Sequence, residues 1–384
     1  MILLSWRRLC GRQFRITRRV CYSQHVAAER IRRRKFMRIL LLALCFIALL
    51  YMPAVSASDH TTYQAVAAWG GEGNGEGEFN GPYGIAVDDE GYIFVVDESN
   101  GRIQKFDASG TYVSKWGSGG YESGGEFNHP TGIEIAPSGM IFVVDNYNHR
   151  IQAFNETGEF LFLWGTGGTG AGEFNLPTDI AVGPSGDVYV SDFANHRIQK
   201  FDPAGNFLKE WGFEGSGDGQ FLYAESIAAG SDGSIYVADT QNNRTQKFDA
   251  SGAFLLSWGG SGNETGAFHY PIGIAVDADG DVYVADWGNN RIQKFDDEGN
   301  FISAIGSTGT GVGEFSGPTG ITIDDDGNVY VTEWAIDRVQ KFSPISTTEP
   351  STTIPTTSVT TPLGGIGLAG VVLAMVLQAH MKKE

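Results

Sequence analysis

A unit of about 47 residues recurs six times between residues 63 and 344, and this repetition constrains the fold more than any other feature. Each copy opens on a phenylalanine, and successive phenylalanines are separated once by 48 residues and otherwise by 47. They are Phe79, Phe127, Phe174, Phe221, Phe268 and Phe315. A unit this short cannot bury its own apolar side chains and has to stack on its neighbours. The chain is therefore one array, not a series of unrelated domains.

Each copy contains short apolar runs separated by turn signals. In the first copy, Pro82–Ile85 is followed by the hairpin turn Asp-Glu-Gly at 89–91 and by Ile93–Val96, which is apolar at successive positions. A strand that is apolar throughout is expected to be buried on both faces. The pattern predicts an all-β fold, a six-bladed β-propeller of four-stranded antiparallel blades over residues 63–344.

The two ends of the array predict how the ring closes. Five copies finish with a fourth strand, whereas the sixth stops after Phe342. A spare strand at 63–69 precedes the first copy and ends in Trp-Gly, as most fourth strands do. We expect this N-terminal strand to complete the last blade, which leaves no exposed sheet edge at the closure.

The phrase GPYGIAVDDEGYIFVVDESNGRIQKFDASGTYVSKWG at 81–117 resembles the NHL-repeat family, and the six copies cover about three quarters of the chain. The resemblance implies a six-bladed propeller. Related propellers include metal-dependent lyases and lactone hydrolases, and some NHL proteins bind RNA. The third and fourth copies depart from the pattern, because Asp179 and Ser226 replace glycine and Ala224 replaces proline. Such departures mark candidates for function, and we include Glu225 beside them.

An acid and an arginine five residues later occur in every copy. These pairs are Asp97 and Arg102, Asp145 and Arg150, Asp192 and Arg197, Asp239 and Arg244, Asp286 and Arg291, and Glu333 and Arg338. A carboxylate and a guanidinium form strong paired hydrogen bonds. Because six equivalent active sites are not expected, we interpret the pairs as structural clamps across the turn between the second and third strands.

Histidines and acidic turns are the candidates for a metal. His129 and His269 precede the inner strands of opposite blades, and zinc would need a further ligand such as Asp179 or Glu225. The alternative is that both are solvated loop histidines. The turns starting at Asp277 and Asp324 resemble the opening of a calcium loop, but no Glu stands at the twelfth position, which favours hairpin turns. We predict no cofactor, with zinc or calcium as the alternative.

Aromatic residues fall in the turns after the second strands, on the face that also gathers acids. With Asp179 and Glu225 they form the predicted ligand-binding set: Tyr147, Phe193, Trp287 and Trp334. Aromatic rings beside carboxylates suit sugar hydroxyls or a basic peptide, although they can equally pack against neighbouring loops. Glycosylation signals occur in predicted loops at Asn155, Asn243 and Asn263.

Both ends of the chain resemble targeting signals. Residues 1–57 read as a signal peptide region, with the expected start at Met37 and cleavage after Ala57. Residues 345–362 form a Ser/Thr/Pro-rich stalk, and residues 363–381 are apolar enough for a transmembrane helix or a sorting tail. These features predict a propeller held at the extracellular face of the membrane by a C-terminal anchor.

Charge limits the choice of partner. Without residues 1–57 the chain has 15 basic and 44 acidic residues, a net charge of −29, which disfavours a nucleic-acid partner. We predict a cell-surface binding or scaffold module for an extracellular protein, glycan or cell-wall component, in preference to an enzyme. The alternative is a metal-dependent extracellular lyase or lactone hydrolase.

Overall fold

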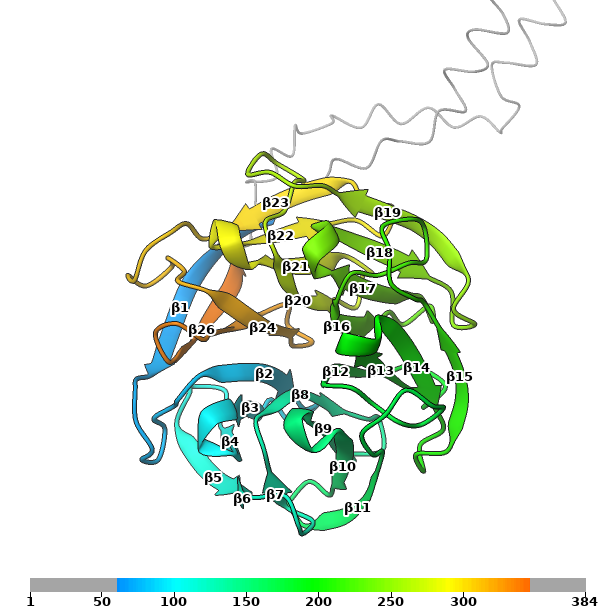
Figure 1. Cartoon of the computed structure of the whole chain (residues 1–384). Helices are drawn as coiled ribbons and strands as arrows, with labels where there is room; N and C mark the ends of the chain where they lie inside the picture. The colour runs from blue at the N-terminus through cyan, green and yellow to red at the C-terminus, as the bar shows by residue number, and fades with distance from the viewer. Residues whose placement is uncertain (1–60, 346–384) are drawn as a thin grey trace, which may run out of the picture. The chain divides into compact units, whose positions relative to one another are not determined.

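The structure is a computed structural model that describes residues 61–345. Six four-stranded antiparallel sheets surround a central channel, as the sequence predicts (Figure 1). The predicted signal region 1–57, nearly all of the stalk and the apolar segment 363–381 lie outside the described residues. Within 61–345, no helix has the length and apolarity that crossing a membrane requires.

The blades follow the chain order, and each runs from an inner to an outer strand. Blade 1 contains β2 (Pro82–Val87), β3 (Ile93–Asp97), β4 (Arg102–Phe106) and β5 (Tyr112–Trp116). Blade 2 contains β8 (Pro130–Ile135), β9 (Ile141–Asp145), β10 (Arg150–Phe154) and β11 (Phe160–Trp164). Blade 3 contains β12 (Pro177–Val182), β13 (Val188–Asp192), β14 (Arg197–Phe201) and β15 (Phe207–Trp211).

The other three blades repeat this arrangement. Blade 4 contains β16 (Ala224–Ala229), β17 (Ile235–Asp239), β18 (Arg244–Phe248) and β19 (Phe254–Gly259). Blade 5 contains β20 (Pro271–Val276), β21 (Val282–Asp286), β22 (Arg291–Phe295) and β23 (Phe301–Ile305). Blade 6 contains β24 (Pro318–Ile323), β25 (Val329–Glu333), β26 (Arg338–Ile345) and, from the start of the chain, β1 (Thr62–Gly70).

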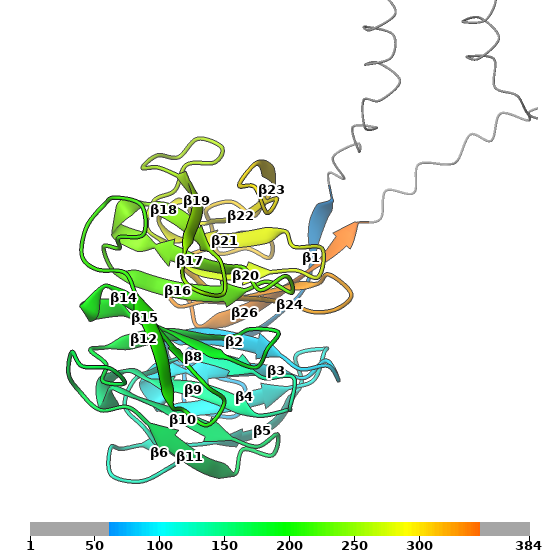
Figure 2. The same ribbon diagram turned by 90° about the vertical axis from the view of Figure 1, so that its right-hand side faces the viewer.

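The ring closes through β1. In blade 6 the strand order is β1-β26-β25-β24, so the first strand of the chain forms the outer edge of the last blade (Figure 2). The hydroxyl groups of Tyr63 in β1 and Tyr283 in blade 5 also lie 2.7 Å apart. The predicted closure is therefore confirmed, and it ties blade 6 to blade 5 as well.

The core lies between the blades, where the second strands are buried along their whole length. Ile93, Phe94 and Val95 have no exposed surface, and the other five second strands are equally enclosed. Aromatic rings fill the outer part of each interface; Trp69 of blade 6 and Phe106 of blade 1, for example, lie 5.9 Å apart between ring centroids. Consecutive apolar residues thus pack on both neighbouring blades at once.

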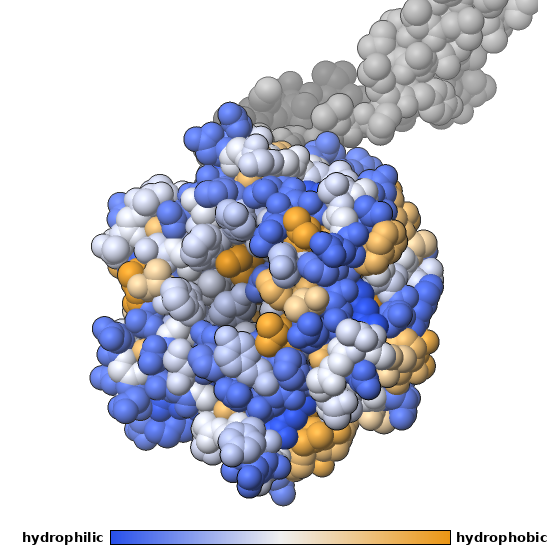
Figure 3. All heavy atoms as spheres, viewed as in Figure 1, coloured by the Kyte–Doolittle hydropathy of each residue, from blue (hydrophilic) through white to orange (hydrophobic). Residues whose placement is uncertain are grey.

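The outer strands expose apolar side chains at the rim of the ring. On the face shown in Figure 3, orange side chains gather beside β15 and β19, where Leu208 and Leu255 are exposed. The 48-residue spacing between the first two copies also has a local result. The loop between blades 1 and 2 forms a short parallel pair, β6 (Ser118–Gly119) with β7 (Glu126–Phe127), whereas the other interblade loops form a single bridge.

Candidate functional site

The two faces of the ring differ in the connections they carry. One face, here called the turn face, carries the short 3-10 turns between second and third strands and the loops that enter the inner strands. The turns are η1 (Glu98–Asn100), η2 (Asn146–Asn148), η3 (Phe193–Asn195), η4 (Thr240–Asn242) and η5 (Trp287–Asn289). The opposite face, here called the hairpin face, carries the Asp- and Gly-rich hairpins. The inner strands surround the central channel (Figure 1).

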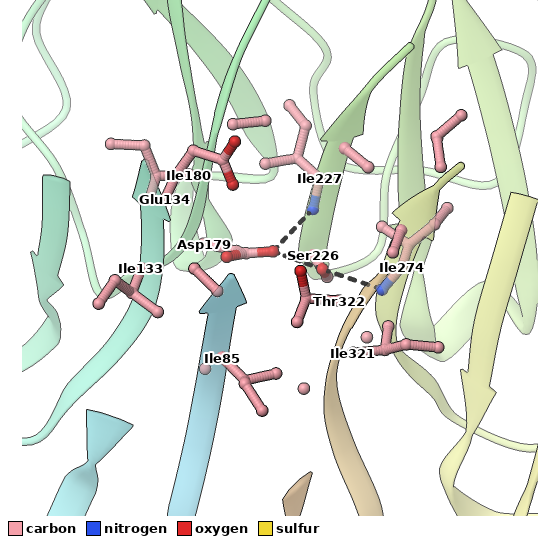
Figure 4. A pocket seen from close by; sticks show the side chains of 18 of the residues that line it. Ile85, Ile133, Glu134, Asp179, Ile180, Ser226, Ile227, Ile274, Ile321 and Thr322 are labelled. Atoms are coloured by element: carbon pink, nitrogen blue, oxygen red, sulfur yellow. Dashed lines mark hydrogen bonds between the residues drawn. The ribbon is translucent and has the colours of Figure 1, made fainter. Parts of the chain in front are cut away.

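The channel contains a cavity of about 220 Å³ lined by the inner strands (Figure 4). Asp179 of β12 points into it, where five blades have glycine or serine instead. Its Oδ2 accepts a short hydrogen bond from the Ser226 hydroxyl and a second from the Ile227 N–H at 3.1 Å. The Ile274 N–H in turn donates to the Ser226 hydroxyl at 3.2 Å. Asp179 therefore links three successive blades across the cavity wall.

Tyr83 and Glu225 meet at the turn-face end of this cavity. Tyr83 belongs to blade 1 and Glu225 to blade 4, which lie opposite each other in a six-membered ring. The Tyr83 hydroxyl donates to Glu225 Oε1 at 2.6 Å. In five of the six inner strands the residues lining the cavity begin one position further along, so this hydrogen bond spans the channel at the edge of the cavity.

Three carboxyl groups of the channel have raised pKa values. Burial raises the pKa of Glu134 to about 8, with a further contribution from the charge of Asp179. Burial also raises the pKa of Asp179 to about 6, although the hydrogen bonds from Ser226 and Ile227 oppose the rise. The pKa of Glu225 rises to about 7 for the same reason, against the hydrogen bond from Tyr83. These groups exchange protons near neutral pH, as general acids and bases often do.

A strip of four side chains crosses the turn face from blade 6 to blade 2. The Glu98 carboxylate accepts a hydrogen bond from Trp334 Nε1 at 3.0 Å, and its other oxygen lies 3.0 Å from His129 Nδ1. The His129 ring packs on Tyr147, with ring centroids 4.6 Å apart. Trp334 and Tyr147 remain 46% and 52% exposed. We call Trp334, Glu98, His129 and Tyr147 the aromatic strip.

A glycine makes room for one end of the strip. Gly81 has a positive φ of 68°, and a Cβ atom there would lie only 2.7 Å from Trp334 Nε1. The indole therefore lies directly over the backbone of the loop that enters blade 1. The other two predicted aromatics are placed differently, since Trp287 is 37% exposed in η5 while Phe193 packs on Tyr223 at 4.6 Å.

Two further loop histidines hold neighbouring blades together. His149 Nδ1 accepts a hydrogen bond from the Leu176 N–H, and His196 Nδ1 accepts one from the Tyr223 N–H, each at 3.1 Å. Asn243, Asn290 and Asp337 occupy the same left-handed position in later blades and accept from Tyr270, Gly317 and Gly81 in the same way. These acceptors are structural, and only Gly101 of blade 1 has no side chain for the role.

The predicted metal ligands are engaged elsewhere. His129 contacts Glu98, His269 packs on Tyr270 at 5.0 Å, and Asp179 and Glu225 bond to Ser226 and Tyr83 inside the channel. Between residues 61 and 345, no three His, Cys, Asp or Glu side chains group closely enough to hold a metal ion. The described donor set therefore does not fit zinc bound through three protein ligands.

The turn at Asp277 does not fit calcium either. Asp277 Oδ1 accepts from the N–H groups of Asp279 and Asp281, which is hairpin geometry. The ammonium of Lys294 lies 3.2 Å from Asp277 Oδ2 and 2.7 Å from Asp281 Oδ2, in the place that a cation would take. The sequon residues differ in exposure: Asn263 is exposed, whereas Asn155 and Asn243 are half-buried and hydrogen-bonded to their own turns.

The acid–arginine pairs form salt bridges in all six blades, with buried carboxylates. In blade 1 the Arg102 Nε lies 2.6 Å from Asp97 Oδ2, and its Nη atoms donate to the carbonyls of Asn74, Gly75 and Glu78. Gln104 joins the network by donating to Glu78 O and Asp97. Each arginine thus fixes the loop that enters its own blade, in addition to clamping the turn between the second and third strands.

Sequence reasoning missed Tyr83 and Glu134 in the channel. Glu134 stands in β8 where four of the other inner strands have alanine, so a comparison of the copies could have identified it as a candidate. Tyr83 stands where three copies have threonine, which signals little, because its role depends on a partner in the opposite blade.

A family model described as the virginiamycin B lyase family matches residues 74–364, three quarters of the sequence. The chain belongs to this family. Among solved structures, virginiamycin B lyase from Staphylococcus aureus is 18% identical with a TM-score of 0.52, covering 74% of this chain and 99% of that one. A gluconolactonase from Xanthomonas campestris is 14% identical with a TM-score of 0.55, covering 70% of this chain and 88% of that one. At these identities the likeness shows the fold.

Short stretches of this family member also match larger curated proteins. The E3 ubiquitin-protein ligase TRIM71 of Rattus norvegicus is 50% identical over 50 residues, 13% of this chain and 6% of that protein. Protein lin-41 of Caenorhabditis elegans is 46% identical over 50 residues, 4% of its length. The match spans about one repeat, so the activities of these whole proteins do not carry over to this chain.

Proposed function

We propose that the propeller binds an extracellular glycan or protein partner through its turn face. The observation that carries the proposal is the aromatic strip, which places two exposed aromatic rings and a carboxylate on one surface across three blades. Aromatic rings commonly supply much of the binding energy at such surfaces. Glu98 holds the Trp334 and His129 side chains in place, so little side-chain entropy is lost when a partner binds.

Glycan and peptide arrays probed with the protein test this proposal. Trp334→Ala and Tyr147→Ala should each lower the affinity for the ligand selected on the arrays by about tenfold or more, as expected for binding hot spots. Leu255→Ala is the matched control, because Leu255 is 49% exposed on an outer strand away from the turn face. Equal losses in all three variants, or no loss in the aromatic variants, would reject the turn face as the binding surface.

A second candidate is an acid–base enzyme, favoured by membership of a lyase family and by Glu225. Its carboxyl group has a pKa of about 7 and lies at the channel mouth, hydrogen-bonded to Tyr83. A lyase reaction needs a base that accepts a proton near neutral pH, and Glu225 has this property. The enzymatic proposal rests on this geometry and on the family match. The solved lyase adds no support beyond the fold, because it shares only 18% identity with this chain.

Turnover of virginiamycin B and of gluconolactone by the protein tests the second candidate. Glu225→Gln should abolish turnover while the fold persists, and Asp325→Asn on the hairpin face should leave it unchanged. If the wild-type protein turns over neither compound but binds an array ligand, the result supports the binding function and argues against the enzymatic one.

A further inference from the structure

The hairpin face carries a groove between blades 1 and 2 with a volume of about 730 Å³. Apolar side chains form its walls, among them Phe94, Val113 and Ile141. Its charged lining consists of four carboxylates and one ammonium, from Asp88, Asp89, Glu90, Glu156 and Lys105. The groove therefore combines apolar side chains in its walls with a net negative charge.

At three of the other five interfaces, a lysine of the third strand reaches the next blade. Blade 2 has Ala153 at this position, and Lys294 of blade 5 pairs with Asp277 and Asp281 of its own blade. The Lys200 ammonium donates to the carbonyl of Ala250 in the next blade at 3.2 Å, and Lys247 donates to that of Asp297 at 2.9 Å. Lys341 of blade 6 reaches the carbonyl of Ala108 in blade 1 at 3.5 Å. Each of these ammonium groups also lies over a tyrosine ring of its own blade, about 5 Å from the centroid.

Lys105 of blade 1 does not make this crossing. Its ammonium lies 4.0 Å above the ring of Tyr92 and 3.7 Å from Asp88 Oδ2, both in its own blade. Glu156 holds the position that Ala250 and Asp297 hold in their blades, and among the described contacts no hydrogen bond joins Lys105 to it. At this interface Glu156 occupies the position whose carbonyl accepts from a lysine elsewhere, but the Lys105 ammonium lies over Tyr92 instead.

We propose that this groove binds a lysine side chain of a protein partner. The incoming ammonium would lie near the Glu156 backbone carbonyl, in the place that Lys200, Lys247 and Lys341 occupy at three other interfaces. Asp89, Glu90 and Glu156, which are exposed, would balance its charge, and the aliphatic stem of the lysine would lie along the apolar walls. The site lies on the opposite face from the aromatic strip and does not depend on the function proposed for it.

Methyl NMR of the isotopically labelled protein, titrated with a blocked Leu-Lys-Leu peptide, tests the site. We expect resonances of Val113 and Ile141 to shift on binding, and the Asp89→Asn/Glu156→Gln variant to bind about fivefold more weakly or worse. The same peptide with Nε-acetyl-lysine should not bind. Both substituted residues are exposed, so the variant should fold as the wild type does.

The strong net negative charge of the chain calls for a matched control. Asp325→Asn/Asp326→Asn removes the same charge from an exposed hairpin of blade 6 on the same face, and should leave the affinity unchanged. If both double variants lose affinity equally, the attraction is nonspecific and the proposal is wrong. It is also wrong if the groove methyl resonances do not shift, or if the acetylated peptide binds as tightly.

Discussion

Tyr83 and Glu225, which are 142 residues apart and belong to opposite blades, share a hydrogen bond of 2.6 Å across the channel. Burial raises the pKa of Tyr83, and the neighbouring Glu225 raises it further, so the phenol keeps its proton and acts as the donor. The ring is thus tied through its centre as well as along its circumference.

Tyr83→Phe should raise the pKa of Glu225 above its value of about 7, because the hydrogen bond from Tyr83 stabilises the ionised carboxylate. The ¹³C chemical shift of the Glu225 carboxyl group, followed through a pH titration, measures the change. Tyr121→Phe is the control, since Tyr121 is 71% exposed. An unchanged or lowered pKa in the Tyr83→Phe variant would show that the two side chains do not interact in solution.

Glu134→Gln should make the protein more stable at alkaline pH. The folded chain holds the Glu134 proton up to a pKa of about 8, well above that of an exposed glutamate. This group's contribution to stability is therefore fully present at acidic pH, falls as the pH rises toward about 8, and is constant above it.

Urea unfolding between about pH 5 and pH 9 measures this effect, and the glutamine variant should gain roughly 2–4 kcal/mol over wild type at the alkaline end. The matched control is Glu298→Gln, an exposed hairpin position. Parallel pH profiles for wild type and Glu134→Gln would contradict the burial of this charge.

The role of His149 at the interface between blades 2 and 3 can be tested by introducing the residues that occupy the equivalent position in other blades. His149→Gly keeps the left-handed backbone but removes the acceptor for the Leu176 N–H, and should cost roughly 1–3 kcal/mol. His149→Asn keeps both properties, as Asn243 and Asn290 do, and should stay within about 0.5 kcal/mol of wild type. Chemical unfolding measures both. Equal stability of the two variants would mean that the acceptor is unimportant.

Arg102→Met should destabilise the protein by roughly 3–5 kcal/mol, because it leaves the buried Asp97 carboxylate without its charged partner. It also releases the carbonyls of Asn74, Gly75 and Glu78. Hydrogen exchange should therefore quicken first in the loop that enters blade 1. Arg102→Lys keeps the charge and should fall between wild type and Arg102→Met. Uniform exchange throughout the ring would argue against a local role for the clamp.

The sequence predicted the architecture because its determinants are local and repeated. Phenylalanine spacing indicated the blade count, and the spare strand at 63–69 indicated the closure, which the structure confirms as β1 beside β26. The ionic pairs were visible for the same reason, since their two members are only five residues apart.

The channel and the interfaces were harder to predict, because their contacts join distant residues. The raised pKa of Glu134 depends on enclosure by six strands, and the Tyr83–Glu225 bond depends on two blades being opposite. Lys105 places its ammonium over Tyr92, although it occurs in the same Arg-x-Gln-Lys-Phe pattern as the lysines that reach the next blade, so the sequence does not reveal this difference.

The position of β1 in blade 6 also has a mechanical consequence. β26 lies between β1 and β25, so a force applied at its C-terminal end has to shear two hydrogen-bonded ladders together. Rupture under load is governed by the unfolding rate. Because both ladders have to break together, we expect this rate to be lower than for a strand held by one ladder. Because β1 and β26 are neighbours in one sheet, a force applied at the start of β1 or at the end of β26 acts on the same blade.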